Sequence, residues 1–547
     1  MKNDTSSSLI KDNNTIKDFR VKESPRCCAQ RWLLASMGLW LGIMTYMMNS
    51  NMSIAVVCMV GSDKNLTGVY DRSNTSVYLE EEFNSSRIKL ENVSEMLESP
   101  PEVCYMTEEG TTRTSKGAEF FWDKKTRSFV LSSYFYGYMV TQIPGGWFSA
   151  KIGGKSLIGA CMALSSAVTL LMPLFARVSV YLLMAARVLL GMSMGMVIPG
   201  YCGLVGIWAL PTERSRFMGL CLFGQMVGAI LGYTTSGLLC IHGFDNGWAS
   251  IFYVHGITGA LFVVTWWFLI YSSPQQHPRI TEAEMSLLIK HSNTQKANPK
   301  ENEKVPWKKI FTYLPVYVMF ITHTCDNWTH YLLLTCLPQF MKEVLKLNIQ
   351  NNGLYSCLPF ISFMAGIAFA GVCADLIRKK KCFTVTTIRK IFQLTGLFGV
   401  TVFILIPGYL TCEQRDIAIM CLCFCTLFEG IGVTGGYTSN SIDIAPRYAS
   451  VIFAVSNTIA SIPGILAPLV VAEITKNQSS EEWRVVFYMS AGVSMFAALL
   501  YGIFANSELA PWANMNIDKE LDIEVDISRS SSMRSGFLEK PTVKEDL

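Results

Sequence analysis

The sequence carries little charge for its length. Only 16% of its 547 residues are Asp, Glu, Lys or Arg, whereas a water-soluble chain carries roughly a quarter. Charged residues are scarce in long continuous blocks of the sequence. This pattern excludes a disordered chain, a coiled coil and an ordinary cytosolic enzyme. Neither sign of charge dominates, since 46 Lys and Arg against 42 Asp and Glu give a net charge of +4. That balance does not suggest a nucleic-acid partner.

Several sequence signals of chemistry are also missing. The chain does not open with a secretory signal peptide, because its first 31 residues are polar and mixed in charge. It has no Walker sequence, so nothing indicates a pump driven by ATP. No Ser-His-Asp group or carboxylate pair stands outside the apolar blocks. We therefore expect neither an enzyme nor a bound cofactor or metal.

Long apolar runs are what the sequence does have. A helix needs about 20 apolar residues to cross a bilayer, and we count about twelve such blocks. They lie at 33–60, 129–150, 156–176, 178–207, 217–241, 248–272, 310–337, 353–374, 391–410, 417–442, 450–472 and 485–506. Lipid leaves no backbone group unpaired, so these blocks are predicted to be the helices of an all-α integral membrane protein.

Basic residues in the short loops predict the orientation of the chain. Lys and Arg gather after the second, fourth and eighth blocks and in the polar segment 273–309. We therefore place the tails 1–31 and 507–547 in the cytosol and expect the second to be disordered. The loop 61–127 then faces the lumen or the exterior, and it carries four glycosylation sequons, which begin at Asn65, Asn74, Asn84 and Asn92. Cys104 of this loop could bond another non-cytosolic cysteine, such as Cys240.

The chain also repeats itself. Trp248–Tyr253 opens the sixth block and Trp483–Tyr488 opens the twelfth, an offset of 235 residues. The turns after the fourth and tenth blocks share this offset. Two six-helix halves, 32–272 and 310–506, are therefore predicted to be joined by the linker 273–309. This organisation is similar to the major facilitator architecture, whose substrate site lies near the midplane between the halves.

One short motif narrows the resemblance. Residues 443–450, Asp-Ile-Ala-Pro-Arg-Tyr-Ala-Ser, resemble the signature of the anion:cation symporter family, which includes sialin, the vesicular glutamate transporters and the type I sodium–phosphate cotransporters. Further matches lie at 142–146, 213–216, 327–331 and 482–488, and the detail around 338–359 is most similar to sialin. The resemblance covers about 31–512. It implies proton- or sodium-linked movement of an organic anion or phosphate, and we expect a monomer.

Charged residues inside spans cost about 2.5–3.5 kcal/mol to insert and mark transport pathways. Arg187, Asp326 and Glu429 fall in the fourth, seventh and tenth spans, which line the cavity of the major facilitator fold. Arg187 matches a family arginine associated with transport, and it could hold a carboxylate through two hydrogen bonds. The alternative is a structural arginine that braces helices.

The sequence departs from the family at this site. A common arginine of the first span is Asn49 here, and an arginine of the seventh span in the glutamate transporters is Asp326. Two span-four glutamates of sialin-like members are replaced by Leu190 and Met194, and two family histidines by Cys202 and Leu131. The usual anion clamp and proton acceptor are therefore mostly absent.

Glu429 offers a replacement for the lost acid. It stands 235 residues after Met194, at the counterpart position in the second half. A carboxyl group there could load and release a proton, so we predict that proton coupling has moved to the tenth span. The alternatives are a locally hydrogen-bonded glutamate and a permanent pair with Arg187.

His323, Asp326 and His330 form one stripe of a helix, spaced i, i+3, i+7. They could line the cavity, with Asp326 pairing Arg187 when no substrate is bound. They could instead bind a cationic or zwitterionic substrate, or ligate a metal. Tyr331, beside them, is expected at the cavity or in packing.

Four loop residues are expected to act at a gate. Glu213 with Arg214, and Asp443 with Arg447, are predicted to pair across the closed cytosolic end. Taken together, the sequence predicts a transporter that moves a small organic anion by alternating access and is coupled to protons. Sodium-linked phosphate or urate transport and a non-transporting receptor are the alternatives. The membrane could be lysosomal, vesicular or plasma.

Overall fold

The computed structural model describes residues 29–61, 118–210, 213–297, 305–380, 382–446 and 448–513. Within these ranges the chain folds as α-helices with short 3-10 turns and one isolated bridge between Val60 and Phe120. The predicted gate residue Arg447 lies outside the described residues, and so do the four sequons at Asn65, Asn74, Asn84 and Asn92.

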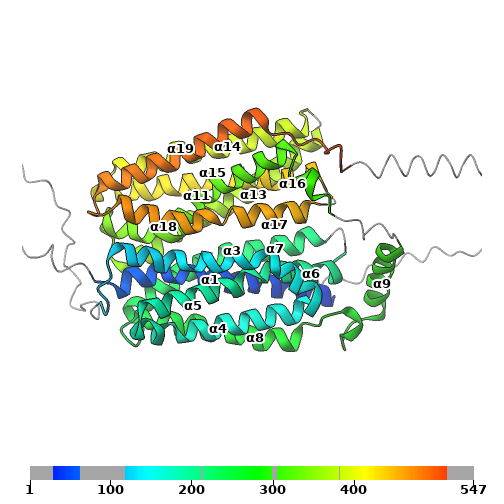
Figure 1. Cartoon of the computed structure of the whole chain (residues 1–547), viewed down its shortest axis with the longest axis horizontal. Helices are drawn as coiled ribbons and strands as arrows, with labels where there is room; N and C mark the ends of the chain where they lie inside the picture. Colours follow the sequence, from blue (N-terminus) through cyan, green and yellow to red (C-terminus); the bar gives the residue numbers. More distant parts are fainter. Residues whose placement is uncertain are drawn as a thin grey trace, which may run out of the picture.

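The helices form two layers (Figure 1). The first half contains α1 (Gln30–Met59), α3 (Lys124–Ile152), α4 (Gly154–Val178), α5 (Val180–Gly195), α6 (Val197–Trp208), α7 (Arg214–His242) and α8 (Trp248–Leu269). The second contains α11 (Leu314–Glu343), α12 (Ile349–Tyr355), α13 (Leu358–Lys380), α14 (Val385–Leu405), α15 (Arg415–Gly435), α16 (Tyr437–Ile444), α17 (Ala449–Ile459), α18 (Ile462–Ile474) and α19 (Ser480–Phe504). Between the halves in sequence lie η3 (Pro274–Gln276), α9 (Glu282–Ala297) and α10 (Trp307–Ile310). The short helices η5 (Ile406–Tyr409) and η6 (Cys412–Gln414) connect α14 to α15.

Each of the twelve apolar blocks folds as a helix or as two consecutive helices. In the described part of the chain, ten of these segments are long and apolar enough to cross a membrane. The other two, α3 and α11, are 29 and 30 residues long but carry more polar side chains. Both lie between the halves, where α3 packs on α18 and α11 packs on α1. These two more polar helices therefore lie where a transport pathway would run.

The fourth and tenth blocks are each broken into two helices. The break between α5 and α6 falls at Met196, and the break between α15 and α16 falls at Gly436. A helix break frees backbone groups that must be paired elsewhere when they are buried. The Gln393 side chain does this at the second break, because its Oε1 accepts from the Tyr437 N–H at 3.0 Å.

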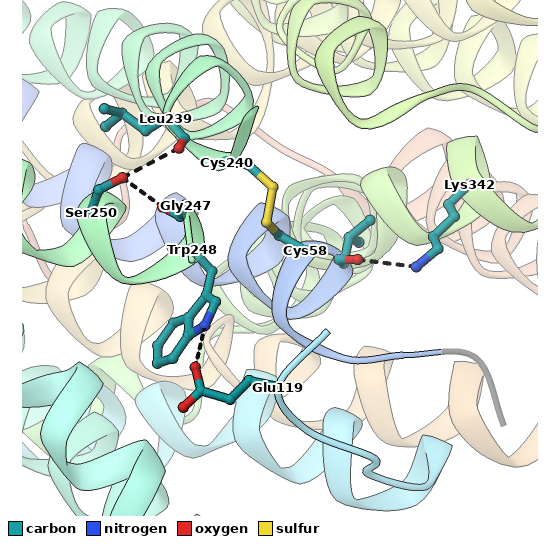
Figure 2. The surroundings of a disulfide bond; sticks show 9 residues. Cys58, Glu119, Leu239, Cys240, Gly247, Trp248, Ser250 and Lys342 are labelled. Carbon is teal, nitrogen blue, oxygen red and sulfur yellow. Dashed lines mark hydrogen bonds between the residues drawn. A yellow bond between two sulfur atoms is a disulfide. The ribbon is translucent and has the colours of Figure 1, made fainter. Parts of the chain in front are cut away.

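A disulfide joins α1 to α7 (Figure 2). Its cysteines, Cys58 and Cys240, have Cα atoms 6.3 Å apart. The suggested pairing of Cys104 with Cys240 is therefore wrong. The two helices approach closely because small residues lie between them: a Cβ on Gly224 would stand only 2.2 Å from the carbonyl oxygen of Leu39.

The disulfide marks one end of the bundle, here called the disulfide end. Residues 61 and 118 lie at this end. At the opposite end, called the linker end, α1 begins, α19 ends and α9 packs outside the bundle (Figure 1). The first helix of the described chain therefore begins at the same end at which the last helix finishes.

Candidate functional site

A narrow cavity lies between the halves, about midway along α1 and α11. α1 contributes Thr45, Tyr46 and Asn49, α3 contributes Tyr134, Phe135 and Tyr138, and the remaining lining residues are Met194, Ile198, Gln225 and Tyr331. The lining is aromatic and polar without a charged side chain. Two residues that were predicted to bind substrate, Asn49 and Tyr331, are among them. We call this space the central cavity.

Arg187 lies one side chain behind the central cavity. It is 2% exposed, and its guanidinium carbon stands 5.3 Å from the centre of the Tyr134 ring. This is a cation–π distance. Its Nε and Nη1 atoms have no hydrogen-bond partner, and among the described residues it forms no ion pair with Asp326 or Glu429. The pairings of Arg187 with Asp326 or Glu429, which the sequence left open as alternatives, are therefore not present in this structure.

The stripe on α11 is divided between two partners. His330 Nδ1 lies 3.0 Å from Glu429 Oε1 on α15, and the Glu429 side chain is 1% exposed. His323 Nδ1 lies 2.8 Å from Ser456 Oγ, and its ring stacks on Tyr437. The side chains do not converge on one point, and the described residues contain no group of three or more possible metal ligands. The metal interpretation is therefore not supported.

Asp326 and Glu429 each keep one oxygen without a partner, Oδ2 and Oε2 respectively. Both side chains are almost fully buried. Buried polar atoms are normally paired, and an exception needs an explanation. A proton or a substrate group that binds during transport would supply the missing partner.

The disulfide end holds a cluster that sequence reasoning missed. Glu343, at the end of α11, accepts from Lys124 Nζ at 2.9 Å and from Trp483 Nε1 and Gln339 Nε2 at 2.8 Å. Lys124 also donates to the carbonyl of Thr475. Lys124 belongs to the first half and Glu343 to the second, so this buried ion pair joins the halves. The sequence did carry a signal for this cluster, because charged residues flank the second and seventh apolar blocks.

A proline in α11 leads to further bonds between the two halves at the disulfide end. Pro338 has no N–H, so the carbonyl of Leu334, four residues earlier, has no helical partner. That carbonyl accepts instead from Ser53 Oγ on α1, at 3.0 Å, and from the Tyr233 hydroxyl on α7. Both donors belong to the other half, so the unpaired carbonyl becomes a bond between halves.

Nearer the midplane, Gln142 of α3 bonds the second half twice. It donates to Ser461 Oγ at 2.9 Å and accepts from Asn457 Nδ2 at 2.7 Å. The cross-half hydrogen bonds of the described residues thus extend from the disulfide end to the midplane.

At the linker end, the predicted gate acids pair within their own halves. Glu213 bonds Arg31 at 3.0 Å, while Asp443 bonds Arg389 at 2.7 Å. Arg214 donates to the carbonyl of Gly206. Glu213 and Arg214 therefore bond other partners and not each other in this structure, whereas the pair of Asp443 with Arg447 stays a prediction because Arg447 lies outside the described residues.

Arg31 also joins the linker to the bundle. It approaches Glu284 of α9 at 3.4 Å, and the N–H groups of Gln30 and Arg31 donate to the same carboxylate. An acid at this position satisfies N–H groups that the first turn of a helix leaves unpaired. Helix α9 is thereby fixed to the start of α1.

Two helical halves that meet at a polar cavity define a secondary transporter of the major facilitator class. The family model of the Major Facilitator Superfamily matches residues 39–468. The chain is 32% identical to human sialin over 494 residues, which cover 90% of this chain and 93% of sialin. It is 34% identical to bovine vesicular glutamate transporter 2 over 432 residues, which cover 78% and 71% of the two chains.

Solved structures share the same fold. A bacterial homolog of the human lysosomal transporter Spinster, inward-facing and unoccupied, aligns with a TM-score of 0.62 at 12% identity, covering 87% of this chain and 99% of that one. The D-xylose–proton symporter aligns with a TM-score of 0.60 at 12% identity, covering 87% and 98%. The chain therefore belongs to the major facilitator superfamily, in the group that contains sialin and the vesicular glutamate transporters. This confirms the predicted helical fold and family, which is one of transporters and not of enzymes.

Proposed function

We propose that this protein moves a small organic anion across a membrane by alternating access, coupled to protons. The observation that carries the proposal is the contact between His330 and Glu429, which lie 3.0 Å apart on facing spans. An imidazole and a carboxylate at hydrogen-bond distance can share and release a proton. Because the two groups come from α11 and α15, loading or losing that proton would change how these helices pack.

Arg187 supports an anionic substrate. It is buried and has two donor atoms without partners, and guanidinium groups bind carboxylates through paired hydrogen bonds. The vesicular glutamate transporters, by name, carry a dicarboxylic amino acid. Asn49, Tyr331, His330 and Asp326 would complete the substrate site around the central cavity.

Disulfides form in oxidising compartments. The bond between Cys58 and Cys240, and the disulfide-bonded state of Cys412, therefore support a lumen or exterior at the disulfide end. The glycosylated loop would lie on the same side. Both termini would then be cytosolic, in a lysosomal, vesicular or plasma membrane, and Glu213, Arg214, Asp443 and Arg447 would lie at the cytosolic gate.

The test is anion uptake into proteoliposomes under an imposed pH gradient, with labelled glutamate, sialic acid and phosphate. We expect one of the organic anions to move with protons, and we expect Glu429→Gln to lower gradient-driven uptake about a hundredfold, within the usual range for lost proton transfer. Asp416→Asn is the matched control, because this exposed acid lies in the first turn of the same helix. Uptake that needs sodium and ignores the pH gradient would favour the sodium-linked alternative. Normal gradient-driven uptake in Glu429→Gln would refute the coupling role.

A further inference from the structure

A second narrow cavity lies at the disulfide end, between α1, α3 and α11. Its inner part is lined by Ser53, Leu131 and Thr335, and its outer part by Arg127, Lys342 and Glu343. We call it the outer vestibule. Nothing in the resemblance to the symporter family pointed to a site here.

The outer vestibule continues the central cavity along the same three helices. Ser53 is four residues beyond Asn49 on α1, and Thr335 is four residues beyond Tyr331 on α11. On α3, which runs the other way, Leu131 lies four residues before Phe135. Four residues are about one helical turn, or about 5.4 Å along the axis. The two cavities are therefore stacked on one path.

An aromatic pair separates the two cavities. The ring of Phe135, from the first half, meets the ring of Tyr331, from the second half, with centres 4.8 Å apart. The hydrogen bond from Ser53 to the carbonyl of Leu334 lies about one helical turn nearer the disulfide end. A solute that passes between the cavities would have to part Phe135 from Tyr331, so these rings stand where a gate would be.

The charges of the outer vestibule favour an anion. Lys342 donates to the carbonyl of Val57 at 3.0 Å, and among the described residues it forms no ion pair. Arg127 donates to the carbonyls of Trp122 and Gly61. The carbonyl partner orients the Lys342 ammonium without cancelling its charge.

Among the described residues, the one acid that lines the outer vestibule does not cancel this charge either. Glu343 is held by Lys124 at 2.9 Å, and that pair is neutral as a unit. Glu482, at the start of α19, accepts from the N–H groups of Asn477 and Ser479 and does not line the outer vestibule. A half-buried cation such as Lys342 focuses its field into a narrow space and raises the local concentration of anions.

We propose that the outer vestibule is an entry site at which Lys342 holds the carboxylate of an organic anion before it passes Phe135 and Tyr331. The inference rests on the proposed anion transport and adds a second binding position to it. When the disulfide end opens, Lys124 would separate from Glu343 and add a second cation to the same site.

The first test measures transport kinetics from each side of oriented proteoliposomes, with labelled glutamate and sialic acid as probes. In Lys342→Gln we expect the apparent KM to rise about tenfold when the anion is offered at the disulfide end, with unchanged maximal rate. The rise should shrink at 0.5 M salt, because salt screens the attraction. Lys342→Arg should restore the affinity. Lys346→Gln is the control, since it removes the same charge from an exposed position nearby.

Three outcomes of this test would overturn the proposal. They are an unchanged KM, an equal rise from both sides, and an equal rise in Lys346→Gln. A fall in maximal rate alone would also overturn it, because Lys342 would then act only through its bond to Val57.

The second test does not need transport. Gln339 lines the vestibule, so Gln339→Cys can be labelled from the disulfide end with an anionic and a cationic methanethiosulfonate. We expect the anionic reagent to react faster relative to the cationic one, and this preference to fall about tenfold when Lys342→Gln is added. A preference that does not depend on Lys342 would refute the vestibule. Absence of uptake in the wild type, with the preference intact, would refute the proposed function alone.

Discussion

His330 and Glu429 lie 3.0 Å apart in the second half, one on α11 and the other on α15. The counterpart of Glu429 in the first half is Met194, which lines the central cavity. In the proposed mechanism, Glu429 and its histidine partner in the second half take over the proton-coupling role of the acid expected in the fourth span. The contact gives the proposed coupling a defined pair of groups.

The first prediction concerns the imidazole of this pair. His330→Gln keeps a hydrogen-bond donor near Glu429 but cannot exchange a proton at physiological pH. We expect uptake driven by a pH gradient to fall at least tenfold, while exchange of labelled for unlabelled anion at equal pH is largely kept. Both are measured in proteoliposomes. His242→Gln is the control, because this exposed histidine ends α7 far from the pair. A parallel loss of both activities would mean that His330 serves packing or binding instead.

Much of the helical fold could be predicted from the sequence. Apolar length determines where helices must form in lipid, and intramembrane charge is rare enough to make Arg187, Asp326 and Glu429 conspicuous. Pairing could not be predicted, because it depends on how helices rotate against one another. Hydropathy alone could not indicate that Glu429 would contact His330 and leave Arg187 beside Tyr134.

The seventh span shows a second reason why contacts between helices could not be predicted from the sequence. Its apolar block was predicted from hydropathy to end at Leu337, and the next residue, Pro338, disfavours the interior of a helix. The helix instead continues to Glu343. The carbonyl that Pro338 leaves unpaired finds donors in the other half, and the extra turns carry Glu343 into contact with Lys124. Bonds to the other half thus offset the cost of proline in the helix. These bonds involve residues far away in the sequence, so the local sequence cannot predict them.

The second prediction concerns the ion pair between Lys124 and Glu343. Their side chains are 11% and 5% exposed, and removal of one partner from a buried pair costs about 3–5 kcal/mol. In Glu343→Gln we expect the disulfide end to open more often. Labelling of Thr335→Cys from that end should then accelerate at least tenfold.

Glu473→Gln is the control for this variant. Glu473 bonds Lys476 at the same end, but both side chains are more than 60% exposed, and exposed pairs contribute about 0–1 kcal/mol. Equal labelling of Thr335→Cys in both variants would show that Lys124 and Glu343 do not hold the halves together.

The third prediction concerns a close backbone approach between the halves at Gly353. A Cβ at Gly353 on α12 would stand 2.7 Å from the Cα of Gly237 on α7, and 2.9 Å from the Tyr233 carbonyl oxygen. Both contacts are with backbone, which cannot move aside as a side chain can. Gly353→Ala should therefore keep the disulfide end from closing and lower transport at least tenfold. Gly371→Ala, on the following helix, is the control, because its added Cβ meets nothing within 4 Å. Normal uptake in Gly353→Ala would show that this closure is not needed.

The fourth prediction concerns pH at the disulfide end. Arg177 bonds Glu119 and Asp245 at 2.7 Å, and its hydrogen bonds lower the pKa of both carboxyl groups below their ordinary values. A carboxyl whose pKa is lowered by folding stabilises the protein above its unfolded pKa of about 4, and this contribution is lost as the pH falls through the folded pKa. The contact should therefore persist at the pH of an acidic organelle, near 5.

The variant Arg177→Gln tests the direction of this pH dependence. We expect it to lower the unfolding temperature by a similar small amount at pH 7.5 and pH 5, since the side chains are about one-third exposed and the attraction is screened by water. The difference from the wild type should then shrink below pH 4, where the carboxyls become protonated in both states. Lys476→Gln, which removes a more exposed charge at the same end, should give no such trend. A difference that already disappears between pH 7.5 and pH 5 would mean that these carboxyls titrate above their ordinary range, and that this contact responds to organelle acidity instead of withstanding it.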